Sequence, residues 1–176
     1  MFFILNLKKN LQVTPEFLGK KISIHLLNLL KRAVEGSFNS RYGYLVKVLT
    51  VDKYGEGKVQ DGSGDVLFPL SYKALVFMPY KGEVLDAVVT QVMEVGFMAA
   101  VGPMNLFVAS QKISSDYRLD NEARPHPRWT SITDTNVHIQ VNSDVRLKII
   151  GIRVNGNEML GVCEMSEDFL GPIKVR

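Results

Sequence analysis

Apolar residues recur every three or four positions between residues 22 and 34, and this period predicts an amphipathic α-helix. Thr14-Pro15 is a helix-start signal and Gly36 suits a left-handed helix end, so we expect a helical segment between them. Gly19 is a candidate point of division into a short turn and a longer helix. The apolar stripe is wider than one small sheet would cover, which leaves two interpretations: a helix buried on all sides, or a helix packed against another chain.

Runs of β-branched and aromatic residues, which are typical of strands, surround this helix. They are the opening MFFILNL, the run YGYLVKVLTV from residue 42, and the run YKALVFM that ends before Pro79. Glycine-rich turn signals at 54–57 and 61–64 indicate a hairpin tip between the second and third runs. Because the character of the chain changes between Pro79 and Lys81, we expect an α+β N-terminal domain over residues 1–80.

Five further strands are predicted in the second half, where short apolar runs alternate with turn residues. The runs cover residues 82–94, 95–101, 104–110, 145–154 and 159–165. Five strands with hairpin-like links in about 90 residues are the count of an all-β oligonucleotide/oligosaccharide-binding (OB) barrel, which we expect over residues 81–176. The polar stretch 111–136, with Arg124-Pro125-His126-Pro127-Arg128 inside it, is expected to be an exposed loop between strands.

Composition narrows the class of protein. The sequence is 46% hydrophobic and 22% charged, as in soluble globular proteins, and no run of apolar residues is long enough to predict a membrane span. The single cysteine, Cys163, cannot form an intramolecular disulfide, which favours a reducing compartment. The net charge is only +3, so any attraction to nucleic acid must come from local clusters of lysine and arginine.

No group of residues has the spacing of a catalytic or metal site. The three histidines lack metal-ligand spacing and have no cysteine pair to join. Gly55-Glu56-Gly57-Lys58 lacks the first glycine and the final hydroxyl of a phosphate-binding loop, and Asp61-Gly62-Ser63-Gly64-Asp65 lacks the ligand spacing of a calcium loop. The sequence therefore predicts a protein without a cofactor, without a metal and without an active site of its own.

A candidate RNA-binding surface lies in the second half of the chain. Arg146 and Lys148 alternate with apolar residues along one predicted strand, so both cations share its solvent face. If this face adjoins the second and third barrel strands, Phe97 and Phe107 lie nearby, and RNA bases can stack on such rings while cations hold phosphates. The alternative is that one ring, most readily Phe97, fills the barrel core and the cations are merely solvated.

Several segments resemble known families. Lys81-Gly82-Glu83-Val84, Gly96-Phe97, the run LFVAS at 106–110 and the run VRLK at 145–148 resemble the ribosomal S-one type RNA-binding barrel. Together with TPEFLG, YGYLVKV, VGPMNLFV and EDFLGPI, in this order over essentially the whole chain, they resemble the seventh-subunit family of eukaryotic RNA polymerase II. This is a family of stalk subunits that has relatives in the archaeal polymerase.

The resemblance implies a nuclear, non-catalytic subunit that pairs with the fourth subunit of RNA polymerase II, docks on the polymerase core near the clamp and contacts exiting single-stranded RNA. It also implies a truncated ribonucleoprotein-like N-terminal domain before the OB barrel. The RNA-binding candidates are Phe97, Phe107, Lys112, Arg146 and Lys148. The candidates for the subunit interface are Phe17, Leu18, Leu26 and Leu30. The candidates for the docking tip are Gly55, Gly57, Asp61, Gly62 and Gly64.

The rival hypothesis is a free-standing RNA-binding factor of translation or RNA decay, in which the barrel alone carries the function. A hydrolase or transferase is disfavoured because the sequence contains no grouping of a nucleophile with a base, or of metal ligands.

Overall fold

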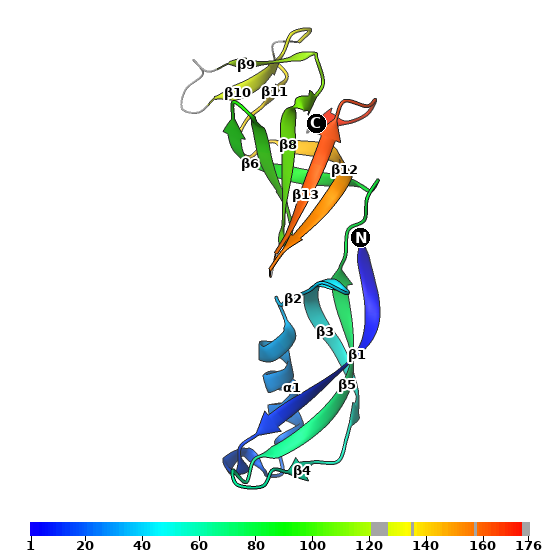
Figure 1. Cartoon of the computed structure of the whole chain (residues 1–176), viewed down its shortest axis with the longest axis vertical. Helices are drawn as coiled ribbons and strands as arrows, with labels where there is room; N and C mark the ends of the chain where they lie inside the picture. The colour runs from blue at the N-terminus through cyan, green and yellow to red at the C-terminus, as the bar shows by residue number, and fades with distance from the viewer. Residues whose placement is uncertain (121–126, 135, 157, 174–176) are drawn as a thin grey trace. The chain divides into compact units, whose positions relative to one another are not determined.

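The computed structural model describes residues 1–120, 127–134, 136–156 and 158–173. Contacts divide the chain into two units, Met1–Pro79 and Tyr80–Arg176 (Figure 1). Within the described residues, the first unit contains one sheet and the second contains two. No helix in the described ranges is both long and apolar enough to cross a membrane.

The first unit is an antiparallel sheet with a helix against one face (Figure 1). Its strands follow the order β1-β5-β3-β2, and a short β4 also pairs with β5. The strands are β1 (Phe2–Val13), β2 (Phe38–Asn39), β3 (Gly43–Tyr54), β4 (Lys58–Val59) and β5 (Val66–Phe77). The helices are the 3-10 turn η1 (Pro15–Phe17) and α1 (Ile22–Val34). The predicted division of the helical segment near Gly19 is thus confirmed, although the Thr14 hydroxyl makes no capping hydrogen bond.

The core of this unit lies between α1 and the sheet. Leu26 and Leu30 of α1 are 2% and 0% exposed and pack with the side chains that β1, β3 and β5 direct toward the helix. The helix is buried on this face only, because Ile24 on the same helix is 61% exposed, so the interpretation of a helix buried on all sides is wrong. The prediction that Leu26 and Leu30 form a subunit interface is wrong, because this sheet already covers both side chains.

Strand β3 is irregular along its whole length. Its pairing with β5 shifts register three times, so that Val46, Leu49 and Asp52 are extra residues without a partner on β5. Bulges increase the local twist of a strand. They also explain why Val46 and Leu49 are 41% and 45% exposed although they belong to an apolar run, since the extra residues fall outside the regular alternation.

The second unit contains a closed five-stranded barrel, and all five predicted strands are confirmed. The strands are β6 (Val84–Met93), β7 (Gly96–Val101), β8 (Met104–Ile113), β12 (Asp144–Asn155) and β13 (Glu158–Met165). Strand β13 closes the barrel by pairing parallel to β8 and antiparallel to β12, while β12 pairs with β6. The short strand β14 (Gly171–Pro172) pairs with β12 beside this closure. The order is that of an OB barrel.

The prediction of an exposed loop over residues 111–136 is wrong for the described part of that stretch. Strand β8 continues to Ile113, and a small antiparallel sheet follows in the order β11-β10-β9. Its strands are β9 (Tyr117–Asp120), β10 (Arg128–Ser131) and β11 (His138–Ile139). Trp129 and Ile113 are 8% and 6% exposed, and Ile139, which pairs with Trp129, is 0% exposed, so this part of the chain buries apolar side chains despite its polar composition. Residues 121–126 and 135 of the predicted loop lie outside the described residues.

Candidate nucleic-acid interface

The two phenylalanines of the predicted RNA surface point in opposite directions. Phe97 is 0% exposed and fills the barrel interior, where its β7 position pairs with Val108 of β8. Phe107 stands between the buried Leu106 and Val108, so its partly exposed ring points outward. A buried ring cannot stack on a base, and the assignment of Phe97 to RNA binding is therefore wrong. Phe107 stays a candidate.

Arg146 is held by a carboxylate on the neighbouring strand. Its Nε donates to Oδ1 of Asp86 at 2.7 Å and its Nη2 donates to Oδ2 at 3.0 Å, and the two residues face each other in the β12–β6 register. The hydrogen bond from Arg146 lowers the pKa of Asp86, so this carboxyl stays ionised. The positive charge of Arg146 is thus opposed by a matched negative charge at the same surface.

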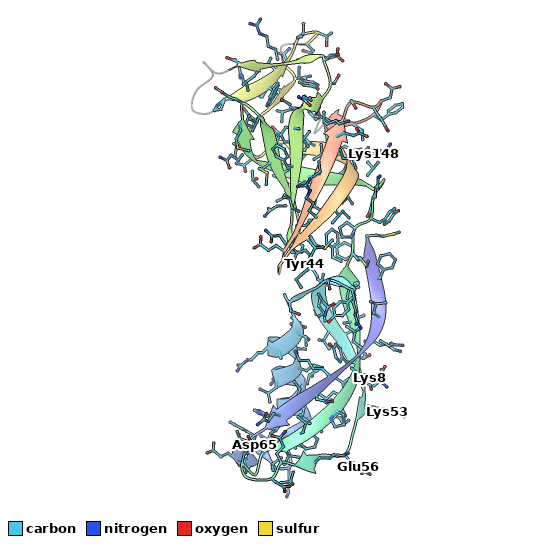
Figure 2. All side chains as sticks on the ribbon, in the orientation of Figure 1. Lys8, Tyr44, Lys53, Glu56, Asp65 and Lys148 are labelled. Atoms are coloured by element: carbon cyan, nitrogen blue, oxygen red, sulfur yellow. The ribbon has the colours of Figure 1, made fainter. Side chains whose placement is uncertain are left out.

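Lys148 and Lys112 are paired in the same manner. Lys148, labelled in Figure 2, donates from Nζ to Oε1 of Glu167, and this hydrogen bond raises the pKa of the lysine. Lys112 Nζ lies 3.5 Å from Oε2 of Glu164, which faces Lys148 in the β12–β13 register. Each predicted RNA-binding cation therefore has a carboxylate beside it.

The cations are also not beside the exposed ring. Phe107 is on β8 and Arg146 and Lys148 are on β12, with β13 between these two strands on one side of the barrel. Two strand spacings separate them by about 9.5 Å before any offset along the strands. The structure thus does not assemble the predicted group of two rings and two cations.

Changing Arg146 and Lys148 together to glutamine should weaken binding of an oligouridylate less than about threefold and change the log–log salt slope by less than about one unit. The reason is that phosphates would have to displace Asp86 and Glu167, which would then repel them. Fluorescence anisotropy at several salt concentrations measures both quantities. A slope reduction of two units would show that both cations contact phosphates despite their partners.

The remaining interface candidates lie on the turn before α1. Phe17 and Leu18 are 50% and 41% exposed, unlike Leu26 and Leu30. The Phe17 ring stacks on His25 of α1 with 4.2 Å between ring centroids, which fixes its position on the surface. An exposed aromatic ring held in one orientation is suited to protein contacts.

The glycines of the predicted docking tip are required by the local geometry. A Cβ on Gly55 would lie 2.5 Å from Cγ of Pro69, and one on Gly57 would lie 2.6 Å from Cγ1 of Val66. Gly62 and Gly64 have φ angles of +94° and +73°, which favour glycine. Asp61 is exposed between these two pairs of glycines.

The tip is also tied to the sheet. Gln12 Nε2 of β1 donates to Oδ2 of Asp65 at 2.6 Å, and the Gln60 amide donates to the Asp65 carbonyl at 2.8 Å. Figure 2 labels Asp65 and Glu56 at the end of the sheet where β4 lies. Val59 of β4 is 68% exposed there, and sequence reasoning did not select it. An apolar residue flanked by lysine and glutamine carries no signal that separates an exposed position from a buried one.

Within the described ranges, no three histidine, cysteine, aspartate or glutamate residues are placed to hold a metal ion. The thiol of Cys163 is buried, and desolvation raises its pKa to about 12. A thiol in this state is a packing group and a poor nucleophile.

The division of charge between the units was the signal that sequence reasoning missed. Residues 1–79 contain 11 lysines and arginines against 6 aspartates and glutamates, a net charge of +5. Residues 80–176 contain 10 against 12, a net charge of −2. The positive field of this chain thus belongs to the first unit, although the barrel was expected to attract RNA.

Two protein-family models match the chain in succession. Residues 8–64 match the SHS2 domain found in N terminus of Rpb7p/Rpc25p/MJ0397. Residues 78–161 match the S1 RNA binding domain.

Curated relatives align with nearly the whole chain. The DNA-directed RNA polymerase II subunit RPB7 of Glycine max is 40% identical over 173 residues, covering 98% of this chain and 97% of the relative. The corresponding subunit of Dictyostelium discoideum is also 40% identical, with 98% and 99% covered. That of Saccharomyces cerevisiae is 33% identical over 175 residues, with 98% and 100% covered.

Proposed function

Because the chain belongs to the RPB7 family of RNA polymerase II subunits, we propose that it is a non-catalytic stalk subunit of this polymerase and works in the nucleus. The observation that carries the proposal is similarity along the full length, with the two family models in sequence. A free-standing RNA-binding factor would need only the barrel, whereas here the first unit is matched as well.

In this function the two domains have different roles: residues 1–80 make the protein contacts, and residues 81–176 contact the transcript. The N-terminal domain, of truncated ribonucleoprotein-like type, pairs with the fourth subunit and places its tip on the polymerase core near the clamp. The exposed Phe17 and Leu18 support a protein contact beside α1, and the glycine-shaped tip supports a docking element. Contacts that differ between two clamp positions would bias the clamp toward one of them.

The barrel contributes a weak and sequence-tolerant contact with the transcript. Phe107 is a partly exposed ring on the barrel, and the cations Lys112, Arg146 and Lys148 are paired with carboxylates. Weak binding suits a surface past which RNA must keep moving.

Affinity purification of the tagged full chain from nuclear extract tests the proposal. The largest polymerase subunits and the fourth subunit should co-purify in stoichiometric amounts at moderate salt. Recovery of ribosomes or decay enzymes without polymerase would support the free-standing factor and overturn the proposal.

Changing Val59 to aspartate should weaken association with the polymerase core about 10-fold or more, because a charged carboxylate would replace an exposed apolar side chain at the tip. Quantitative co-purification with the core measures the effect. The matched control is Ile132→Asp, since Ile132 is 65% exposed and lies in the other unit. Equal losses in the two variants would remove the docking role from the tip.

A further inference from the structure

One face of the first unit's sheet is left uncovered by α1. Lys9 of β1 points toward the helix, where its Nζ donates to the Ala33 carbonyl at 3.0 Å. Because successive residues of a strand point to opposite faces, Lys8 points away from the helix. Figure 2 shows Lys8 and Lys53 on the side of the sheet away from α1.

The pairing of β1, β5 and β3 brings four lysines together on this open face. Three successive rows cross the strands in register: Ile4, Leu75 and Lys47; Asn6, Lys73 and Thr50; Lys8, Ser71 and Lys53. We call Lys8, Lys47, Lys53 and Lys73 the lysine face. Neighbouring strands are about 4.8 Å apart and residues on one face of a strand about 6.7 Å apart, so each lysine lies within about 10 Å of another.

The lysine face is exposed and poor in opposing charge. All four lysines are exposed, and none forms an ion pair with a carboxylate in the described part of the chain. Asp52 precedes Lys53 in the chain, and its Oδ1 accepts a hydrogen bond from Thr50 Oγ1 at 3.3 Å. The cations of the barrel differ in this respect, because Arg146, Lys148 and Lys112 each have a carboxylate partner.

We propose that the lysine face holds the phosphate backbone of single-stranded RNA. The inference rests on the proposed function in one respect, that the chain works beside a transcript. Lysine, serine, threonine and asparagine are among the side chains that contact nucleic-acid phosphates. Two of the three rows consist of these types alone: the row of Asn6, Lys73 and Thr50, and the row of Lys8, Ser71 and Lys53, which we call the two rows around Ser71. The net charge of +5 on residues 1–79 adds a favourable field.

The same composition argues against a protein partner and against base recognition here. The centres of protein interfaces are depleted in lysine and enriched in aromatic residues, whereas the two rows around Ser71 contain no apolar side chain. These rows also contain no ring on which a base could stack. The contact is therefore with the RNA backbone, independent of sequence and sensitive to salt.

Binding of a labelled oligouridylate to the purified full chain tests the inference. The variant changes Lys8, Lys53 and Lys73 to glutamine, and the matched control changes Lys20, Lys21 and Lys58, three exposed lysines of the same unit outside these rows. Near 0.1 M salt the variant should bind roughly 10- to 100-fold more weakly, with a log–log salt slope smaller by about two units. The control should change the salt slope by less than about a third of the change seen in the variant. Circular dichroism should show both variants folded, because all six lysines are exposed.

Three results would overturn the inference, each in a different way. If the variant keeps the wild-type slope and the Arg146 and Lys148 double variant loses it, RNA is held by the barrel and the proposed function stands. If the wild-type chain binds an oligoglutamate more tightly than an oligouridylate, the lysine face serves an acidic protein. If the oligouridylate does not bind at all, the RNA contact fails, while co-purification still decides whether the chain is a polymerase subunit.

Discussion

Replacing Gly96 with alanine should destabilise the barrel by about 3 to 5 kcal/mol, enough to unfold a marginally stable domain. Gly96 has a φ of +142°, and a Cβ there would lie 2.0 Å from the Val108 carbonyl oxygen. The clash involves backbone on the facing strand β8, so no side-chain rotation can relieve it. Urea unfolding of the full chain, followed by tryptophan fluorescence, measures the loss.

The control for this variant is Gly102→Ala. Gly102 also has a positive φ, +55°, but nothing lies within 4 Å of a Cβ built there. Its alanine variant should therefore lose only the cost of the left-handed conformation, about 1 to 2 kcal/mol. Equal losses at the two glycines would mean that backbone conformation alone, and not the approach of β7 to β8, explains the requirement for glycine at position 96.

Changing Leu30 to alanine should reduce the free energy of unfolding of the isolated chain by about 2 to 5 kcal/mol. Leu30 is 0% exposed in the core between α1 and the sheet, so truncation leaves a cavity that the sheet cannot readily close. Ile24, on the same helix but 61% exposed, is the matched control, and Ile24→Ala should change stability by less than about 0.5 kcal/mol.

The same pair of variants distinguishes a core residue from an interface residue. If Leu30 belonged to a subunit interface, its alanine variant would leave the isolated chain as stable as the wild type and would weaken only the heterodimer. Denaturation of the chain without a partner is therefore the decisive measurement. The residues left for an interface on this side of the unit are Phe17 and Leu18, together with the outer face of α1 around Ile24.

The predictions from periodicity succeeded where one apolar run formed one element. The five barrel strands and the helix over residues 22–34 lie where the runs predict them, because alternation and the 3.6-residue period reflect burial on one side. The opening strand was predicted too short. Beyond Leu7 the polar run Lys8-Lys9-Asn10 interrupts the apolar pattern, yet β1 continues through Leu11 to Val13.

Individual site residues were harder to predict than elements, for a physical reason. The alternation of Arg146 and Lys148 with apolar residues located them correctly on one outward face. It contained no information about Asp86 and Glu167, which come from distant segments and reach these cations only after the barrel closes. The burial of Phe97 and Leu30 likewise depends on what other elements place against them.

The amino-acid sequence by itself determined the helix over residues 22–34, the five barrel strands and the unequal division of charge. These properties depend on each residue and its near neighbours along the chain. Only the tertiary structure decided which cations are opposed by carboxylates and which stand free, because that depends on strand register. The register of β1, β5 and β3 places Lys8, Lys47, Lys53 and Lys73 next to one another on one open face, and no local sequence pattern predicts this arrangement.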